Sequence, residues 1–364
     1  MTRRADIAVI GAGMAGASLA AELVGSASIL LVEAEERPGY HSTGRSAAFW
    51  SESYGGPAIQ PLTSASGPYL ATRGFLRARG GLHIARGDGR EALRSLESNH
   101  SGRVRFEPAD RETMVRRIPG LKPGWDWGLA EPSCADIDVA GLHAYYLAQG
   151  RRDGVELVAS ARLLKAKRTG AGWRLDTTAG PIEADILVDA AGAWADEVAR
   201  IAGASPLRIQ PYRRTVAQLR VHPPAPPDLP LVIDALERFY FKPEAGGRIW
   251  LSPHDETASD PCDCAPDELD VALAIERLEQ VVDWRVERVE HKWAGLRSFA
   301  PDRLPVYGFD PRVDGFFWFA GQGGFGIQTA PAAARLGAAL LLGREPDGMV
   351  RAIEAGAYSP ARFG

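Results

Sequence analysis

Cysteine is scarce in this sequence, whose 364 residues include only Cys134, Cys262 and Cys264. Three cysteines cannot form a complete set of disulfides, and such sparse usage is typical of a reducing compartment. We therefore expect a cytoplasmic protein, with peripheral contact with the inner membrane left open. Cys262 and Cys264 could form half of a zinc site, but no second ligand pair stands at zinc spacing, so we expect no metal.

Long hydrophobic runs and an excess of one charge are also lacking. No uninterrupted run reaches the roughly 18 apolar residues that a membrane-spanning helix needs. The first apolar run enters glycines by Gly11, so it predicts a strand and not a signal peptide. Lys and Arg number 42 against 46 Asp and Glu, without a basic block, which argues against a nucleic-acid partner.

Length and composition indicate a folded protein with more than one core. A chain of 364 residues exceeds the size at which a single core usually stops growing, so two domains are expected. Apolar residues make up 45% and charged residues 24%, which leaves no room for a large disordered tail.

A glycine turn stands near the start of the chain. An apolar strand over residues 7–10 leads into Gly11-Ala12-Gly13-Met14-Ala15-Gly16, a helix over 17–23 and a second strand over 29–33. The first two glycines let the backbone approach a pyrophosphate, the third lets helix and strand pack closely, and the helix N-terminus supplies positive potential. Glu33 ends the second strand, where an acid can hold a ribose diol. The unit predicts dinucleotide binding without separating NAD from FAD.

In two further segments a predicted strand is followed by small residues and then by a helix, as in the first unit. Residues 184–188 predict a buried strand that runs into small residues and a helix over 195–202. Residues 315–320 predict another strand, followed by a glycine-rich turn over 321–326 and a helix from about residue 328 to 342, with Pro331 in its first turn. The dinucleotide domain is therefore expected to combine segments from the start, middle and end of the chain.

The region between these segments predicts a second domain. Residues 215–221 alternate as a strand, and residues 239–242 and 248–251 predict a hairpin around a turn at 243–247. Residues on one face of a helix that begins near Asp267 are Val271, Ile275, Leu278 and Val282. A mixed sheet with a helix is a plausible substrate domain.

Three segments together resemble the signatures of the D-amino acid oxidase superfamily. They are residues 39–48, Gly295-Leu296-Arg297 with Pro301, Asp302 and Pro305 downstream, and residues 321–328. The similarity runs from residue 6 to about residue 342 and is weakest over 65–130. It implies an α/β fold with a Rossmann-like FAD-binding domain over 1–80, 140–205 and 300–364. It also implies an α+β substrate-binding domain, built on a mixed or antiparallel sheet, over 81–139 and 206–299.

The glycine unit and the resemblance together imply where FAD is bound. Covalent flavin occurs in the superfamily on a cysteine near the position of Gly295, but no cysteine of this chain stands there, so noncovalent FAD is expected. The expected FAD contacts are Gly11, Gly13, Met14, Ala15, Gly16, Glu33, Ala34, His41, Ser42, Thr43, Arg45, Ser46, Ala47, Ala48, Ala191, Gly192, Trp194, Gly295, Arg297, Gly323, Gly324, Phe325, Gly326, Ile327 and Gln328.

Within the superfamily the pattern is most similar to that of bacterial D-arginine dehydrogenases. The resemblance implies a substrate pocket at Phe49, Tyr54, Arg214, Tyr240, Arg297 and Gln328, with Tyr54, Tyr240 and Arg297 as the catalytic set. Phe49 stands where the related enzymes carry a histidine, and residues 79–82 lack the acid that a guanidinium-binding site requires. An acid from elsewhere in the chain is left open, with His83 and Glu52 as the residues to check. A neutral or apolar D-amino acid is therefore the expected substrate.

Hydride transfer from an amino acid needs the α-carbon held over flavin N5. Arg297 can grip the α-carboxylate with two parallel hydrogen bonds, unless it forms a structural salt bridge instead. Because a strand alternates, only one of Arg213 and Arg214 can point inward. Tyr54 and Tyr240 can wall the pocket and offer hydroxyl groups, or simply pack in a core.

The sequence thus predicts an FAD-dependent D-amino acid dehydrogenase or oxidase of amino acid catabolism. Its products would be an imino acid and then, after hydrolysis, the 2-oxo acid and ammonia, with oxygen or a quinone-like molecule as electron acceptor. The alternatives are a glycine or N-methyl amino acid oxidase, a 2-hydroxy acid dehydrogenase, a non-catalytic flavin-binding module and an NAD-only dehydrogenase.

Overall fold

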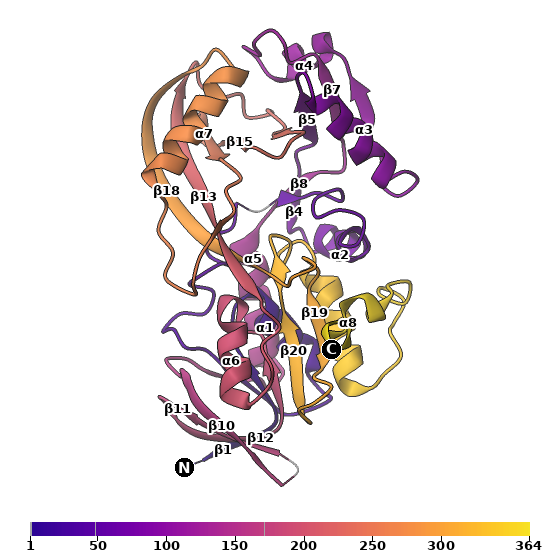
Figure 1. The fold of residues 1–364 in the computed structure, drawn as a ribbon, viewed down its shortest axis with the longest axis vertical. Coiled ribbons are helices and arrows are strands. Elements are labelled where there is room, and N and C mark those ends of the chain that lie inside the picture. The colour runs from indigo at the N-terminus through magenta and orange to yellow at the C-terminus, as the bar shows by residue number, and fades with distance from the viewer. Residues whose placement is uncertain (1, 48, 171) are drawn as a thin grey trace.

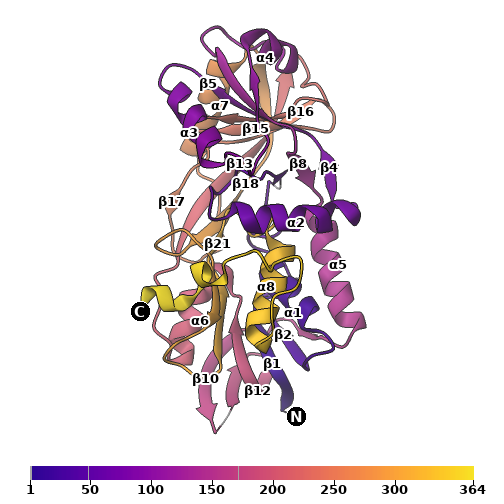
Figure 2. The same cartoon turned by 90° about the vertical axis from the view of Figure 1, so that its right-hand side faces the viewer.

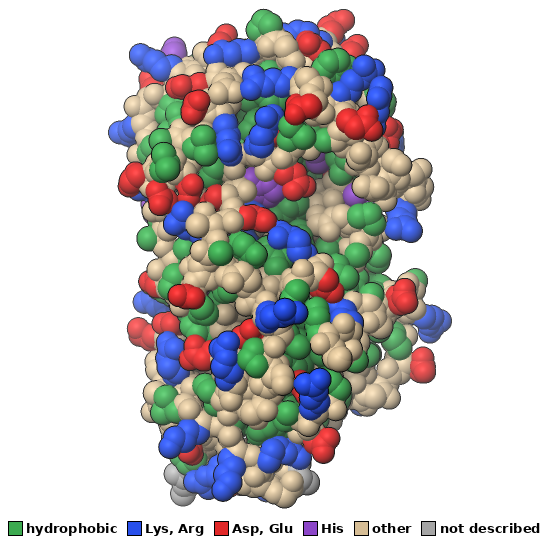
Figure 3. Space-filling model, viewed as in Figure 1, with side chains coloured by type: hydrophobic (Ala, Val, Ile, Leu, Met, Phe, Trp, Pro, Cys, Tyr) green, Lys and Arg blue, Asp and Glu red, His purple; other side chains and the backbone are tan. Residues whose placement is uncertain are grey.

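The computed structural model describes residues 2–47, 49–170 and 172–364. The molecule is elongated, with two parts stacked along its long axis and the N-terminus at the far end of the lower part (Figure 1). Among the described residues no helix has both the length and the apolar character needed to cross a membrane. On the face in Figure 3, acidic and basic side chains are interspersed.

The lower part is built on an eight-stranded sheet. Its parallel centre has the order β9-β2-β1-β12-β20, and antiparallel strands complete it at β10, β11 and β19. The bounds of these strands are β1 (Arg3–Ile10), β2 (Ile29–Val32), β9 (Glu156–Val158), β10 (Leu163–Thr169), β11 (Gly172–Thr177), β12 (Gly180–Asp189), β19 (Val306–Phe309) and β20 (Phe316–Ala320).

Helices cover this sheet because its central strands are apolar on both faces. All four residues of β2 and all five of β20 are buried, as expected for parallel strands between two layers. Helices α1 and α8 pack together, and α5 packs against α1 (Figure 2). The helices of this part are α1 (Met14–Leu23), α5 (Val139–Arg152), α6 (Ala195–Ala202) and α8 (Ala330–Leu342).

The upper part is built on a ten-stranded, mostly antiparallel sheet in the order β21-β18-β13-β16-β15-β14-β5-β7-β6, with β17 paired to β13. Its long strands β13 and β18 extend down toward the lower part (Figure 1). The strands are β5 (Gly81–Ala85), β6 (Glu107–Ala109), β7 (Trp127–Glu131), β13 (Gln210–His222), β14 (Leu231–Asp234), β15 (Tyr240–Glu244), β16 (Arg248–Ser252), β17 (Thr257–Ala258), β18 (Arg285–Phe299) and β21 (Gln322–Gly323). Its helices are α3 (Gly89–Asn99), α4 (Arg111–Arg117) and α7 (Glu268–Val281).

A small sheet and one helix lie between the two parts. Strands β3 (Phe49–Trp50), β8 (Ala135–Ile137) and β4 (Leu76–Ala78) form the sheet, next to α2 (Gln60–Thr72) (Figure 2). This sheet joins segments that the sequence assigns to different domains, so we keep those domain boundaries as a proposal. Short 3₁₀ turns complete the chain at Gly192–Trp194, Ala355–Tyr358 and Pro360–Phe363.

Most elements predicted from sequence patterns are confirmed. Helix α6 has the predicted bounds, the hairpin of β15 and β16 encloses the predicted turn, and Asp267 caps α7 by accepting a bond from the amide of Leu269. Helix α8 begins at Ala330, two residues later than predicted, after a turn in which Thr329 N–H bonds the carbonyl of Phe325.

Candidate active site

The turn between β1 and α1 has no room for side chains at two of its glycines. Gly11 has φ of +100°, and a methyl group there would lie 2.5 Å from the carbonyl oxygen of Ala190. A methyl group at Gly16 would overlap the carbonyl oxygen of Gly11. The turn therefore brings β1, α1 and the end of β12 into close contact, as predicted, and leaves the start of α1 open to a ligand.

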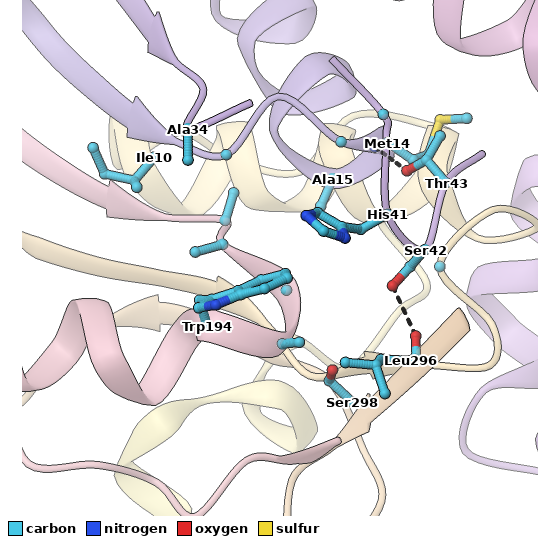
Figure 4. Close-up of a pocket in the computed structure, with 18 of the residues that line it drawn as sticks. Ile10, Met14, Ala15, Ala34, His41, Ser42, Thr43, Trp194, Leu296 and Ser298 are labelled. Atoms are coloured by element: carbon cyan, nitrogen blue, oxygen red, sulfur yellow. Dashed lines mark hydrogen bonds between the residues drawn. The ribbon is translucent and has the colours of Figure 1, made fainter. Parts of the chain in front are cut away.

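A long groove begins at this turn and lies at the carboxyl ends of β1, β2 and β12. Figure 4 shows His41 and Trp194 pointing into it from opposite sides, with Ser42 bonded to the backbone of Leu296. Predicted FAD contacts that line this groove are Gly11, Gly13, Met14, Ala15, Glu33, Ala34, His41, Ser42, Thr43, Ser46, Ala191, Gly192, Trp194, Arg297, Gly323, Gly324, Gly326 and Ile327.

The polar groups of the groove fit a dinucleotide. Glu33 accepts hydrogen bonds from the amides of Ala12 at 2.8 Å and Glu35 at 2.9 Å, which fixes its carboxylate in the groove. Nε2 of His41 lies 3.1 Å from Glu35, whereas its buried Nδ1 has no partner among the described residues. A buried nitrogen without a partner in a groove is a position for a ligand atom.

Other groove residues were not among the predicted FAD contacts. Some stand within the segments quoted above, but a motif does not say which of its side chains faces a ligand; those of α6 and of residues 161–163 are revealed only by their convergence in space. The groove residues missed in these two ways are Ile10, Glu35, Gly39, Tyr40, Ala161, Arg162, Leu163, Ala190, Ala193, Glu197, Val198, Ile201, Leu296, Ser298 and Gln322.

Some predicted FAD contacts do not line the groove. Arg45 turns its guanidinium away, pairing with Asp263 and donating to the carbonyl of Cys264 at 2.9 Å. Ala47 and Phe325 are buried in apolar clusters beside the groove. Gly16 and Gly295 serve close packing, and Ala48 lies outside the described residues.

The side chain of Gln328 makes three hydrogen bonds inside the protein. Its Oε1 accepts from the amide of Ser51 at 3.2 Å, and its Nε2 donates to the carbonyl of Tyr54 at 3.1 Å and to the hydroxyl of Thr63 at 3.0 Å. The predicted contacts of Gln328 with substrate and flavin stay a prediction. Gln328 holds the segment that carries Tyr54.

Two buried arginines share one face of the upper sheet. Strands β13 and β18 are antiparallel, with Tyr212 opposite Arg297 and Arg214 opposite Gly295. Side chains that are two residues apart on a strand lie on the same face, so Arg214 and Arg297 point to the same side. Arg213 points to the other side, where it bonds Asp270 of α7 at 2.7 Å. The sequence left open which of these two neighbours points inward, and in the structure it is Arg214.

Arg297 has no carboxylate partner among the described residues. Its guanidinium makes only long hydrogen bonds, of 3.4 Å to the carbonyl of Leu296 and 3.5 Å to that of Arg45, and its exposed fraction is 8%. Burial lowers the pKa of Arg297, and the charge of Arg214 adds to the effect. A buried cation left unpaired is costly, so this site favours an incoming carboxylate.

Arg214 is held more firmly. It donates to the backbone of Asp255 at 2.8 Å and to the carboxylate of Glu256 at 3.0 Å, and lies 3.4 Å from the hydroxyl of Tyr54. Burial opposes its charge, but the fields of Tyr54, Tyr240 and Glu256 together raise the pKa of Arg214. Arg214 thus supplies a fixed positive charge beside Arg297.

Aromatic rings gather around these arginines. The ring of Phe49 lies 5.2 Å from that of Tyr54 and 5.5 Å from that of Tyr240. A methyl group at Gly324, which lines the groove, would lie 2.5 Å from the hydroxyl of Tyr54. The predicted substrate residues other than Gln328 therefore form one cluster, which adjoins the groove at Gly324 and Arg297.

A buried carboxylate holds the segment before Tyr54 from the other side. Oε2 of Glu131 accepts from the hydroxyls of Ser51 at 2.9 Å and Ser53 at 2.6 Å, and Oε1 accepts from the amide of Glu52 at 2.7 Å. His83 also lies within 3.4 Å of Glu131, which is fully buried. Glu131 is thus a buried acid beside this segment, but both of its carboxylate oxygens already accept hydrogen bonds from the protein.

Comparison with known proteins identifies the groove. A model of the family described as FAD dependent oxidoreductase matches residues 6–340. The chain belongs to this family. FAD is therefore the dinucleotide for which the groove is built, and the alternative of an NAD-only dehydrogenase is excluded.

Individual relatives of this FAD-dependent oxidoreductase share only about 30% of its residues over the matched part. Glycine oxidase of Pseudomonas aeruginosa is 30% identical over 261 residues, which cover 69% of this chain and 66% of that enzyme. FAD-dependent oxidoreductase domain-containing protein 1 of Xenopus laevis is 28% identical over 200 residues, covering 50% of this chain and 39% of that protein. The chain therefore spans less than two thirds of the length of either relative.

A solved structure supports the fold throughout. L-proline dehydrogenase from P. horikoshii superposes with a TM-score of 0.86, covering 100% of this chain and 98% of the other at 20% sequence identity. The predicted fold class, a Rossmann-like FAD-binding fold with a second mixed sheet, is confirmed. The finer similarity to D-arginine dehydrogenases stays a prediction.

Proposed function

We propose that this FAD-dependent oxidoreductase oxidises the α-carbon of a neutral or apolar D-amino acid. The observation that carries the proposal is Arg297, a buried guanidinium without a carboxylate partner among the described residues, at the junction of the FAD groove and the aromatic cluster. A planar guanidinium binds a carboxylate with two parallel hydrogen bonds. A substrate held in this way has its α-carbon next to the groove.

Bound FAD supplies a hydride acceptor at N5. The α C–H bond breaks, and its hydrogen leaves with both bonding electrons, while the nitrogen lone pair forms a C=N bond and one N–H proton passes to solvent. Water then converts the imino acid to the 2-oxo acid and ammonia. In this reaction Arg297 and Arg214 fix the carboxylate, whereas Tyr54 and Tyr240 close the site against water.

The walls of the cluster support a neutral or apolar substrate side chain. Phe49, Tyr54 and Tyr240 offer three aromatic rings. The carboxylate of Glu256 is taken by Arg214 and Arg303, and Glu131 is occupied by the segment before Tyr54. A cationic side chain would therefore meet the charges of Arg214 and Arg297, and neither Glu256 nor Glu131 is free to pair with it. The preference for the D-enantiomer rests on the resemblance to D-arginine dehydrogenases alone.

One rival function has support of its own. The relative from Pseudomonas aeruginosa is named glycine oxidase, so glycine or an N-methyl amino acid is the second candidate substrate. Such a substrate would use the same arginines and leave the aromatic cluster largely unfilled. A 2-hydroxy acid would also be bound through its carboxylate by Arg214 and Arg297.

Anaerobic bleaching of the flavin absorbance tests the proposal. The panel contains D- and L-amino acids with neutral, cationic and anionic side chains, glycine, sarcosine and 2-hydroxy acids. Selective bleaching by neutral D-amino acids is expected, and readmission of air then distinguishes an oxidase from a dehydrogenase. Bleaching by glycine or sarcosine alone would assign the rival function, and bleaching by L-amino acids alone would overturn the stereochemical preference.

A further inference from the structure

His254 lies in the substrate cluster, although no sequence pattern singled it out. It follows β16, and its ring lies 5.7 Å from that of Tyr240 and 6.3 Å from that of Tyr54. Its backbone has φ of +55°, a left-handed conformation that few residues other than glycine adopt, although histidine adopts it more often than most. Such strain persists only where the surroundings impose it, and it is concentrated at functional sites.

Hydrogen bonds impose this conformation. Nδ1 of His254 lies 2.6 Å from the carbonyl oxygen of Glu237, another residue with positive φ, at +56°. Arg277 donates both to the carbonyl of Pro253, at 2.8 Å, and to that of Arg238, so it fastens the two loops together. Asp255 fixes the other end of the segment by accepting from the amide of Thr215 and its hydroxyl.

The bond to Glu237 also determines which ring nitrogen carries the hydrogen. A carbonyl oxygen can only accept, so Nδ1 is the donor and Nε2 of the neutral ring has a free lone pair. No hydrogen bond to Nε2 exists in the part of the chain that the structure describes. Burial and the positive charge of Arg214, with smaller effects of Arg303 and Arg297, lower the pKa of His254 to about 3. His254 is therefore neutral at physiological pH.

The hydrogen-bonding groups around the cluster differ in kind. Arg214 and Arg297 are donors only, which suits the carboxylate of an amino acid. Nε2 of His254 is an acceptor only, which suits an N–H group and repels a carboxylate. An ammonium ion beside two guanidinium groups would be repelled, so the site favours the neutral amine, which is the form that can release a hydride.

We propose that Nε2 of His254 accepts a hydrogen bond from the α-amino group of the bound amino acid and so positions the substrate for oxidation. This inference rests on the proposed function and deepens it, because it assigns the amine as well as the carboxylate of the substrate to named groups. His254 is a positioning residue and not a base, since a group that stays neutral to such low pH is too weak to remove the proton of an ammonium ion.

Two substitutions at His254 test the inference. His254→Phe keeps an aromatic ring between Tyr54 and Tyr240 but has no acceptor, whereas His254→Gln keeps an acceptor at similar reach. Each variant is compared with the wild-type holoenzyme by anaerobic flavin reduction with the best amino acid substrate of the panel. Binding of the matching 2-oxo acid, which has the carboxylate but no N–H group, is followed by the change in the spectrum of oxidised flavin.

His254→Phe is expected to lower the efficiency of reduction about tenfold, the usual effect of losing one neutral hydrogen bond. His254→Gln should recover most of this loss, and affinity for the 2-oxo acid should change by no more than roughly twofold in either variant. Unchanged reduction by His254→Phe, or equal weakening of amino acid and 2-oxo acid binding, would overturn the inference. Wild-type flavin that no amino acid reduces would overturn the proposed function as well, so the two failures are distinguishable.

Discussion

Arg297 of β18 and Arg214 of β13 lie on the same face of one antiparallel strand pair, and both are almost completely buried. Only Arg214 has a carboxylate partner among the described residues, and that partner, Glu256, also bonds Arg303. Gly295 stands opposite Arg214 and leaves space for the guanidinium of Arg297, since a methyl group there would lie 3.0 Å from it. The pair is a preformed positive site beside the FAD groove.

Replacing Arg297 by lysine should weaken substrate binding strongly. Lysine keeps the positive charge but cannot form two parallel bonds, and losing a buried charge-paired contact costs about 2–5 kcal/mol, or roughly a hundredfold in efficiency. Anaerobic reduction at several substrate concentrations measures the effect. Arg213→Lys is the matched control, because Arg213 bonds Asp270 on the opposite face. Equal losses in both variants would argue against a substrate contact.

Gly16→Ala should prevent FAD binding or folding. Its new methyl group would overlap the carbonyl oxygen of Gly11, and the backbone on both sides is packed. Overpacking typically costs about 1–3 kcal/mol, and occasionally more. Denaturant unfolding and the FAD content per chain report the effect, with Gly348→Ala, where a methyl group meets no atom within 4 Å, as control. A Gly16→Ala protein with full FAD content and wild-type stability would contradict the packing described for this turn.

Glu131→Gln should destabilise the protein and loosen Tyr54. The amide puts donors where the carboxylate accepts from Ser51, Ser53 and Glu52, which costs about 1–3 kcal/mol. Chemical denaturation measures this loss, and a higher KM for substrate is the accompanying sign at the active site. Glu107→Gln, on the neighbouring strand and exposed, should leave both unchanged.

Unfolding at acid pH is a second test of the stabilising role of Glu131. Burial opposes ionisation of Glu131, but bonds and charge from His83, with bonds from Ser53 and Ser51, lower its pKa below the ordinary 4.5. A lowered pKa stabilises the folded state above pH 4.5, and this stabilisation is lost as the pH falls through the folded-state value. The stability of Glu131→Gln should therefore depend less on pH below 4.5 than that of wild type. Parallel curves would show that Glu131 does not titrate in this range.

The flavin should leave the protein when it unfolds. Cys134, Cys262 and Cys264 are all absent from the described residues that line the groove, which supports noncovalent FAD. Acid or heat precipitation should release all of the flavin as FAD into the supernatant. Yellow colour retained by the washed precipitate would demonstrate a covalent bond.

The strand–turn–helix unit at the start of the chain was predictable because its determinants are local. Gly11, Gly13 and Gly16 stand within one strand–turn–helix unit, and Glu33 directly follows the next strand, so the chain order itself brings them together. Helix α6 and the β15–β16 hairpin were equally predictable, since both are bounded by their own turn and capping residues. Arg213 and Arg214 are neighbours on β13, so their side chains point to opposite faces. The pairing of β13 with β18 was enough to decide which of the two points inward.

The sequence could not predict side-chain contacts whose partners are distant along the chain. Gln328 belongs to a flavin-like signature, but its amide bonds Ser51, Tyr54 and Thr63, more than 260 residues away. Arg45 stands in the flavin loop, yet Asp263 draws its guanidinium outward. No local pattern encodes such pairings.

By itself, the sequence determined that this chain folds around a dinucleotide groove and places arginine on the strands beside it, because periodicity, glycine spacing and capping act within a few residues. Only the tertiary structure decided which polar groups remain available to a substrate. Among the described residues, Arg297 is left without an acid because Glu256 pairs with Arg214 and Arg303, and Nε2 of His254 is left free because the loop of Glu237 engages the other ring nitrogen. That outcome depends on how all segments pack, and packing is a property of the whole fold.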